Sequence, residues 1–172
     1  MDAATALYAR AWSQGDVGLL DAIMAPDHVQ NDAVWQPAAA DAGAQSNQGR
    51  ERMRRGIAGY RRAYPDVRFE VLEAAAVRAP GPRLWRVFVH WRAAGTNLGP
   101  IRNQPPTGKR AEFGGVTVAT VLVDSALSAQ LLRSDVYRQA PADEAAYFLA
   151  RGVVAPGGGS DAGGSGGGGA PD

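Results

Sequence analysis

The sequence contains no cysteine, so disulfide bonds, thiolate nucleophiles and cysteine-based zinc sites are excluded. Histidine is scarce, with two residues in the whole chain. The motif His-x-x-x-His is also missing, as are acidic pairs at metal-binding spacing, and Gly-x-Ser-x-Gly matches only at 163–167 (GGSGG), where no strand-like pattern precedes it. Zinc hydrolysis and serine-hydrolase chemistry therefore have no support, and we expect no bound metal.

Long apolar runs and a surplus of one charge are absent too. No apolar stretch approaches the ~20 residues that a membrane helix needs, and the first residues, MDAATALYARAWSQGD, leave no room for a signal peptide. The 18 basic and 17 acidic side chains give a formal net charge of +1, which offers no electrostatic reason for nucleic acid or a membrane as a partner. We expect a soluble, cytoplasmic protein with no targeting segment visible.

The chain consists of one protein-like block followed by a tail. Of its 172 residues 45% are hydrophobic, enough for one domain with its own core. From Pro156 onward the composition changes to mainly Gly, Ser, Ala and Asp, without apolar side chains large enough to offset the entropy of ordering them. We predict a single domain over residues 1–155 and a disordered glycine-rich tail over 156–172.

Four segments carry apolar residues at the spacing of an α-helix. The clearest stripe consists of Met53, Ile57, Tyr60 and Tyr64, in a helix that stops before Pro65. Cap and turn residues bound the other helices. The predicted helices span residues 4–14, 17–25, 50–64 and 142–151.

After Pro65 the apolar pattern changes its period from 3.6 to 2 residues. Four segments rich in Val, Thr and aromatic residues follow, and the short turns between them predict an antiparallel meander. Because the helices mostly precede these strands, we predict an α+β fold in which N-terminal helices cover one face of a curved antiparallel sheet. The predicted strands span residues 67–77, 83–95, 111–123 and 127–139, with a shorter strand over 28–35.

The stretch 95–110, GTNLGPIRNQPPTGKR, contains a Gly-Lys pair and raises the question of a phosphate-binding loop. Such a loop needs Gly, four residues, Gly-Lys and then Ser or Thr, followed by a helix. Here Asn103 stands at the first glycine, Arg110 follows the lysine, and a strand comes next. We therefore interpret the stretch as a connection between two long strands that lies over the contents of their concave face.

Strand alternation divides segment 84–92 into two faces. One face mixes an aromatic residue with titratable groups and consists of Arg86, Phe88, His90 and Arg92. The other is apolar and consists of Trp85, Val87, Val89 and Trp91. We expect helices to leave the apolar face uncovered, which makes it the predicted homodimer interface. His90 is either a structural residue or a group that works in a pocket.

Asp135 is an acid within a predicted strand, on the same face as Leu131, Arg133 and Tyr137. Strands disfavour Asp among apolar neighbours, so its presence needs a reason. One reading is an ion pair with Arg133 or with an arginine on the adjacent strand. The other is a carboxyl group in an apolar cavity, where desolvation raises its pKa so that it exchanges protons near neutral pH. For Asp32, turn hydrogen bonds and pocket chemistry are equally good explanations.

Several stretches together resemble the SnoaL-like polyketide cyclases, which belong to the superfamily of cone-shaped folds named after nuclear transport factor two. They are YARAWSQGDVGLLDAIMAPDHVQND, GRERMRRGIAGYRRAYPDVRFEV, WRAAGTNLGPIRNQPPTGKRAEFGG and a last strand ending in Asp135. The resemblance spans roughly residues 5–150. Its most specific parts are 63–66 (AYPD), 95–96 (GT) and 105–108 (PPTG), in the family's order and spacing.

The resemblance implies a cone-like α+β barrel, a curved sheet wrapped around helices with an open mouth leading to an apolar pocket. In characterised cyclases an Asp on the last strand is the acid/base of an intramolecular aldol closure, without metal or organic cofactor, and Asp135 matches that position. The sequence also departs from the family. Asn97 replaces the His that often follows Gly-Thr, Leu131 replaces a Trp, and pairing with Arg133 would lower the pKa of Asp135.

We therefore expect a cofactor-independent cyclase or isomerase that acts on a small hydrophobic, polyketide-like carbonyl compound. Asp135 is the predicted catalytic residue. The predicted substrate-binding residues are Asn97, His90, Asp32, Phe88 and Leu131. Two alternatives stay open: a module of the same fold that binds a small molecule or a protein without catalysis, and a hydratase or dehydratase that uses His90.

Overall fold

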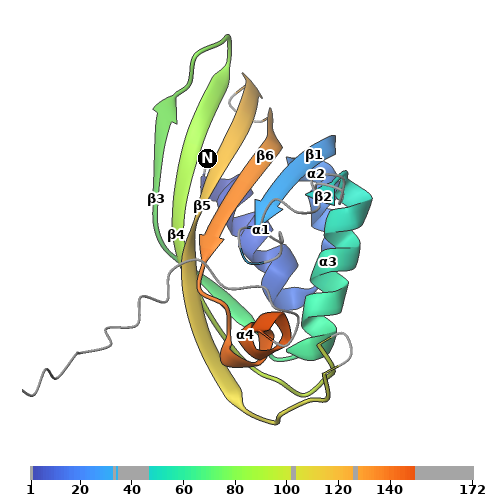
Figure 1. Ribbon diagram of the computed structural model, residues 1–172. Coiled ribbons are helices and arrows are strands. Elements are labelled where there is room, and N and C mark those ends of the chain that lie inside the picture. Colours follow the sequence, from blue (N-terminus) through green and yellow to red (C-terminus); the bar gives the residue numbers. More distant parts are fainter. Residues whose placement is uncertain (1, 33, 35–46, 102–103, 126–127, 150–172) are drawn as a thin grey trace, which may run out of the picture.

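The structure is a computed structural model that describes residues 2–32, 34, 47–101, 104–125 and 128–149 (Figure 1). The predicted tail over 156–172 lies outside the described residues. Within them, no helix is long and apolar enough to span a membrane.

Helices occur where the apolar spacing predicted them, with one boundary moved. They are α1 (Asp2–Gln14), the 3₁₀ turn η1 (Val17–Leu19), α2 (Leu20–Ile23), α3 (Arg50–Ala63) and α4 (Ala142–Leu149). The second predicted helix, 17–25, is shorter than expected, because Met24 is already extended and begins a strand. Pro26 explains the change, since a proline drives the preceding residue out of helical geometry.

Six strands form one sheet in the order β2-β1-β6-β5-β4-β3. They are β1 (Met24–Asp32), β2 (Asn47–Gln48), β3 (Arg68–Arg78), β4 (Leu84–Thr96), β5 (Arg110–Ser125) and β6 (Ser128–Arg138). The predicted meander is confirmed, because β3 to β6 pair antiparallel in chain order. One pair differs from this antiparallel arrangement, since β1 runs parallel to β6.

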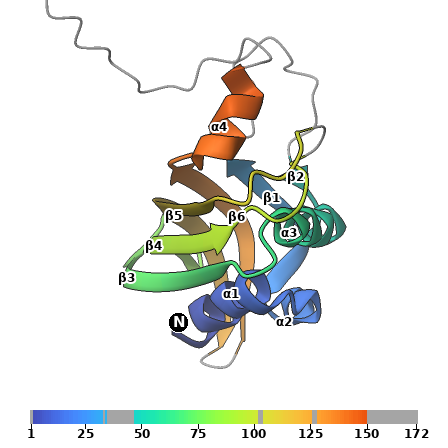
Figure 2. The same cartoon turned by 90° about the horizontal axis from the view of Figure 1, so that it is seen from below.

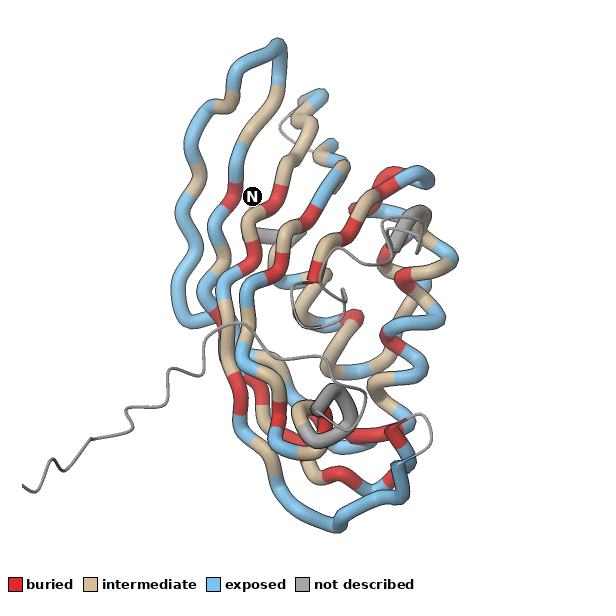
Figure 3. The backbone as a smooth tube through the Cα atoms, in the orientation of Figure 1, coloured by how far each residue is buried: buried red, intermediate tan, exposed pale blue. Residues whose placement is uncertain are grey.

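The sheet curves around the N-terminal helices, with α1 and α3 on its concave side and α4 beside the end of β6 (Figures 1 and 2). Buried and exposed residues alternate along β5 and β6 (Figure 3), as they do in a sheet with one covered face. The α+β class with helices inside a curved sheet is therefore confirmed. Among the described strands the edges β2 and β3 do not pair, so the sheet stays open.

The apolar core is divided into two clusters. The first joins the end of α3 to the middle of the sheet, and its members are Ala63, Tyr64, Val67, Trp91, Ala93, Ile101, Phe113 and Val136. The second joins α1, α2 and α3 near the start of β1, and its members are Ala11, Leu20, Ile23, Met24, Met53 and Ile57.

Residues of the stretch 95–110 fasten the end of α3 to the sheet. The backbone N–H groups of Leu98 and Gly99 donate to the carbonyl oxygen of Ala63 at 3.0 and 3.1 Å. Asp66 accepts hydrogen bonds from the Thr96 backbone N–H at 2.7 Å and the Thr96 hydroxyl at 2.8 Å. A side chain at Gly99 would clash with the carbonyl oxygen of Arg62. The stretch therefore packs against α3.

Candidate functional site

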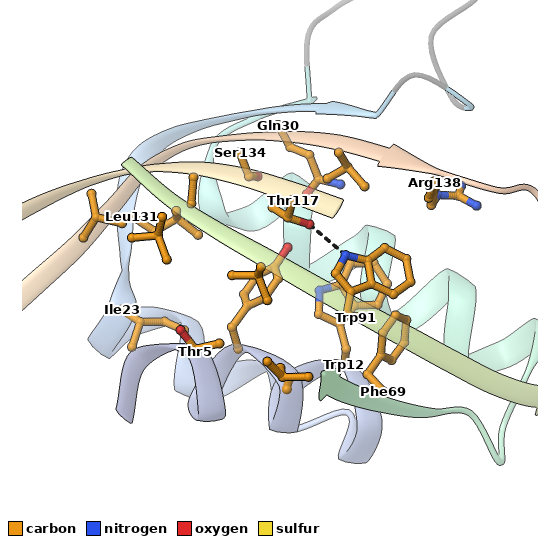
Figure 4. A pocket seen from close by; sticks show the side chains of 18 of the residues that line it. Thr5, Trp12, Ile23, Gln30, Phe69, Trp91, Thr117, Leu131, Ser134 and Arg138 are labelled. Atoms are coloured by element: carbon orange, nitrogen blue, oxygen red, sulfur yellow. Dashed lines mark hydrogen bonds between the residues drawn. The ribbon is translucent and has the colours of Figure 1, made fainter. Parts of the chain in front are cut away.

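The concave face of the sheet, with α1 and α3, encloses a cavity of about 350 Å³ (Figure 4). A volume of this size is in the range of small-molecule sites. Most of its lining is aliphatic or aromatic. The lining residues are Thr5, Tyr8, Ala9, Trp12, Ile23, Gln30, Asp32, Tyr60, Phe69, Val71, Trp85, Val87, Val89, Trp91, Phe113, Thr117, Ala119, Val121, Val123, Ala129, Leu131, Ser134, Val136 and Arg138.

The apolar face of β4 is inside this cavity, which corrects the predicted dimer surface. Trp85, Val87, Val89 and Trp91 all belong to the lining. The sheet curves toward this face and α1 covers it, so these side chains are not an exposed patch. The expectation that helices leave them uncovered is wrong, and so is the face named for the homodimer. Described residues of the stretch 95–110 do not line the cavity, so our interpretation that this stretch lies over its contents is also wrong.

Exposure of the lining falls from one end of the cavity to the other. Near the β5–β6 turn Val121, Val123 and Ala129 are half-buried, whereas Phe113 and Val136 at the other end are buried. The mouth therefore lies beside the β5–β6 turn. The inner end lies beside α4 and the end of β6.

Three charged side chains meet at the inner end and form what we call the acid–arginine cluster: Asp32 on β1, Arg138 on β6 and Glu144 on α4. Arg138 donates from Nε to Asp32 Oδ2 at 2.8 Å, and from Nη1 and Nη2 to the two carboxylate oxygens of Glu144 at 2.7 and 2.8 Å. All three side chains are at most 7% exposed. Asp32 Oδ1 also accepts the Val34 backbone N–H at 3.0 Å. Two carboxylates thus share one guanidinium beside an apolar cavity.

Two further polar atoms of the cavity lining are buried and have no hydrogen-bond partner among the residues that the structure describes. One is Oε1 of Gln30, two residues before Asp32 on β1, and the other is the hydroxyl oxygen of Tyr60 on α3. Both residues line the cavity. A buried polar group without a partner is uncommon in proteins, and at a cavity wall it marks a place where a ligand can supply the missing bond.

A neutral polar chain occupies the wall between β1 and β6. His28 Nε2 lies 3.0 Å from Ser134 Oγ, and both residues are fully buried. Burial lowers the pKa of His28 to about 4, opposed by the nearby charge of Asp27. Burial likewise raises the pKa of Tyr8 to about 12, against the effect of its hydrogen bond with Trp12. At neutral pH this wall therefore holds a neutral imidazole and a neutral phenol.

Asp135 lies on the outer face of the sheet. Its neighbours Ser134 and Val136 line the cavity, and alternation turns the residue between them the other way. Its carboxylate accepts Arg133 Nε and Nη2 at 3.0 and 2.8 Å, and Asn31 Nδ2 at 2.6 Å. The hydrogen bond from Arg133, with a smaller contribution from Asn31, lowers the pKa of Asp135 although burial opposes the shift. The ion-pair reading is therefore correct, and the expected position in an apolar cavity is wrong.

Leu131 does line the cavity, although the sequence put it on the same face as Asp135. A register shift explains the difference: Thr120 pairs with Arg133 while Val121 pairs with Leu131, so β6 carries one extra residue, Leu132. A bulge of this kind moves every side chain beyond it to the opposite face of the sheet.

Three other predicted site residues lie away from the cavity. Phe88 and His90 are exposed on the outer face of β4, because that strand turns its tryptophans inward. Asn97 is buried, but its amide already bonds the chain: Oδ1 accepts the Thr107 backbone N–H at 2.8 Å, and Nδ2 donates to the carbonyl oxygens of Gly99 at 3.0 Å and Ala63 at 3.4 Å. Asn97 therefore stabilises a loop.

Of the six predicted site residues, the structure brings Asp32 and Leu131 together in the cavity. The sequence reading missed Gln30, Tyr60, Arg138 and Glu144. Gln30 could have been found from the sequence, because alternation along the strand puts it on the same face as Asp32. Tyr60 was interpreted only as part of the apolar stripe of its helix. In the described part of the chain, no group of three or more His, Asp or Glu residues has the arrangement of a metal site.

Comparison with solved structures shows the fold. A proposed polyketide cyclase from Acidithiobacillus ferrooxidans is 20% identical with a TM-score of 0.56, over 87% of this chain and 92% of that one. AclR, a proposed hydroxylase from Streptomyces galilaeus, is 20% identical with a TM-score of 0.57, over 81% and 76%. A protein of the nuclear transport factor 2 superfamily from Salmonella enterica is 8% identical with a TM-score of 0.58, over 80% and 87%.

Sequence comparison gives the family directly. A search among curated proteins found no match. The family model of the SnoaL-like domain matches residues 4–127, which is more than half of the chain. The chain therefore belongs to the SnoaL-like domain family.

Proposed function

We propose that this protein is a cofactor-independent enzyme of the cyclase or isomerase type, which acts on a small hydrophobic carbonyl compound in the cavity with Asp32 as its acid/base. The observation that carries the proposal is a carboxylate at the inner end of a mostly apolar cavity. Membership of the SnoaL-like family supports the reaction type, and the name of the Acidithiobacillus ferrooxidans protein agrees with it. In this proposal Asp32 takes the part that the sequence assigned to Asp135.

The bonding of Asp32 leaves it able to accept a proton. Each carboxylate oxygen has two lone pairs, and the Val34 N–H and Arg138 Nε occupy one on each oxygen. Glu144 holds the other two nitrogens of that guanidinium, so Arg138 stays in position while the carboxylate reacts.

The chemistry needs no other reagent. The carboxylate removes a proton from the carbon next to a carbonyl group, and the resulting enolate attacks a second carbonyl carbon of the same molecule. The carboxylic acid then returns its proton to the new alkoxide, which restores Asp32. Acid/base catalysis of this kind contributes ~10² to 10⁴ in rate, and apolar walls that hold the substrate in a folded shape contribute further.

A second candidate function is ligand binding without catalysis. The observation that favours it is that Asp135, the residue matching the family's acid/base, is ion-paired to Arg133 on the outer face. In this case the cavity stores, carries or senses a hydrophobic molecule, and the acid–arginine cluster only stabilises the fold.

Exchange of α-protons separates the two candidates. In D₂O, ¹H NMR follows loss of the acidic α-protons of 2-tetralone, a bicyclic ketone. A cavity of ~150 Å³ already accepts benzene, so this ketone is small enough to enter. We expect the protein to accelerate exchange, Asp32→Asn to lower the rate about 100-fold, and Asp135→Asn, the matched control, to retain it.

Each other outcome has its own meaning. Equal rates for the wild type and Asp32→Asn, with 2-tetralone still bound according to its line broadening, would contradict catalysis by Asp32 and favour the binding module. Loss of exchange in Asp135→Asn alone would return the acid/base role to the family position.

A further inference from the structure

We propose that the cavity selects an uncharged ligand with a hydroxyl group at its buried end, which donates a hydrogen bond to Gln30 and accepts one from Tyr60. The inference rests on the proposed function only in that the same cavity holds the substrate. It adds the polar chemistry of that substrate and the two residues that determine it.

The side-chain oxygen of Gln30 is a hydrogen-bond acceptor that is available to a ligand. The Gln30 side chain projects from β1 into the cavity (Figure 4), the residue is 6% exposed, and Oε1 has no hydrogen-bond partner in the described part of the chain. A carbonyl oxygen buried in this way loses its bond to water on folding and gains none in return. A ligand hydroxyl that reaches the inner end supplies the missing donor.

The hydroxyl group of Tyr60 is a hydrogen-bond donor that is available to a ligand. This hydroxyl is buried with no hydrogen-bond partner within the described ranges, and the residue lines the same cavity. Burial raises the pKa of Tyr60 well above its ordinary value, and the nearby charge of Glu144 adds to the shift. The phenol therefore keeps its proton at neutral pH. Tyr60 and Gln30 line the same cavity as Asp32 and Arg138 of the acid–arginine cluster.

A hydroxyl group meets both demands, and the other common polar groups do not. A ketone or ether accepts from Tyr60 but has nothing to donate to Gln30. An ammonium group donates but leaves the Tyr60 proton without an acceptor. A carboxylate ligand would add a third negative charge to a cluster in which two carboxylates already share one guanidinium.

The surrounding wall favours a planar ring system attached to that hydroxyl. Aromatic side chains meet there at tilted or edge-on angles, with ring centroids 5.4 Å apart for Trp12 and Phe69 and for Phe69 and Trp91. The two indole groups of this wall are already bonded: Trp91 Nε1 donates to Thr117 Oγ1 at 3.0 Å (Figure 4), and Trp12 has a hydrogen bond with Tyr8. Apart from Gln30 and Tyr60, the ligand therefore meets mainly apolar side chains, with aromatic rings beside aliphatic groups.

Isothermal titration calorimetry with three naphthalene probes tests the proposal on the full chain. The probes are 2-naphthol, 2-methoxynaphthalene, which keeps the acceptor but has no donor, and 2-naphthoate, which carries a negative charge. We expect 2-naphthol to bind about tenfold more tightly than the methyl ether, and 2-naphthoate not to bind.

Three substitutions assign the effect to its residues. Tyr60→Phe and Gln30→Met should each remove most of the preference for 2-naphthol over the ether. The matched control is Tyr64→Phe, because Tyr64 also has a buried hydroxyl without a partner but does not line the cavity. This control should keep the full preference. Should Tyr60→Phe fail to fold, Gln30→Met and the wild-type probe series still decide the question.

The results that overturn the inference differ from those that overturn the proposed function. Equal affinity of wild type for 2-naphthol and its methyl ether, binding of 2-naphthoate, or an unchanged preference in both Tyr60→Phe and Gln30→Met would overturn the hydroxyl proposal. None of these results affects 2-tetralone exchange. Conversely, the 2-naphthol preference could stay intact while no Asp32-dependent exchange is observed. This result would contradict the proposed enzyme activity and leave the proposal of a hydroxyl-binding cavity in place.

Discussion

Asn97 was predicted to bind substrate, but its side-chain amide makes its hydrogen bonds to the protein itself. Its amide accepts the Thr107 backbone N–H on one side and donates on the other to the carbonyl oxygens of Gly99 and of Ala63, the last residue of α3, and the side chain is buried. It stands between Thr96, which binds Asp66, and Gly99, which packs on Arg62. At these positions the segments that carry the family resemblance hold the fold together.

Replacing Asn97 should therefore affect stability more than ligand binding. Asn97→Ala removes these bonds and leaves buried backbone groups without partners, so we expect the free energy of unfolding to fall by about 2–4 kcal/mol. Urea denaturation measures it, with Leu98→Ala as a control because Leu98 is 57% exposed. Unchanged stability together with lost 2-tetralone binding would instead make Asn97 a ligand-binding residue.

His28 gives the protein a pH dependence with a defined sign. Its pKa is about 4 when folded against 6.5 for the free side chain, so the folded state favours the neutral imidazole. Its contribution is fully present above pH 6.5 and decreases as the pH falls toward 4. We expect a loss of about 3 kcal/mol over that window. Urea denaturation at several pH values should show a smaller loss for His28→Gln, and identical pH profiles would contradict this.

At the scale of elements, Arg138 connects β6 with β1 and α4. Both of its acidic partners are nearly fully buried. Removing one member of a buried ionic group leaves the others without compensation, which costs about 3–5 kcal/mol. We therefore expect Arg138→Met to be destabilised by this amount in urea denaturation. The double variant Arg138→Met/Glu144→Met should recover part of the loss, and wild-type stability of the single variant would contradict the account.

Some elements of the fold can be predicted from the sequence, and others cannot. The helix α3 and the strands β3 to β6 follow from their apolar periods, because each pattern extends over ten residues or more. The extra residue at Leu132 leaves no trace in those periods, yet it decides that Leu131 faces the cavity and Asp135 does not. The cluster at Arg138 also escapes prediction, because Asp32 lies 106 residues away from Arg138 in the chain and no pattern in the sequence links the two.

At the scale of the whole molecule, the direction in which the sheet curves decides which face is functional. The sequence separates the two faces of β4 correctly, but the choice between inside and outside depends on how the helices pack. Trp85 and Trp91 face inward, and the outer face carries Phe88, Val116 and Tyr137, which are 40%, 37% and 60% exposed.

The homodimer stays a prediction, and its interface moves to this outer face. Dimers that pair back to back are common in the superfamily that the sequence resembles, and Val116 pairs with Tyr137 near the middle of the sheet. We expect sedimentation equilibrium to show a dimer that Val116→Lys converts into monomers, while binding of 2-naphthol is retained. A wild-type monomer at high concentration would contradict the dimer.

The most direct test of the account is to fill the cavity. Ala119 lines it from β5, and Ala119→Phe places a ring in the space that a ligand needs. Its control is Val118→Phe, on the outer side of the same strand. The measurement is the dissociation constant for 2-tetralone by isothermal titration calorimetry. The account predicts at least a tenfold weaker affinity for Ala119→Phe with stability retained, and unchanged affinity in that variant would contradict it.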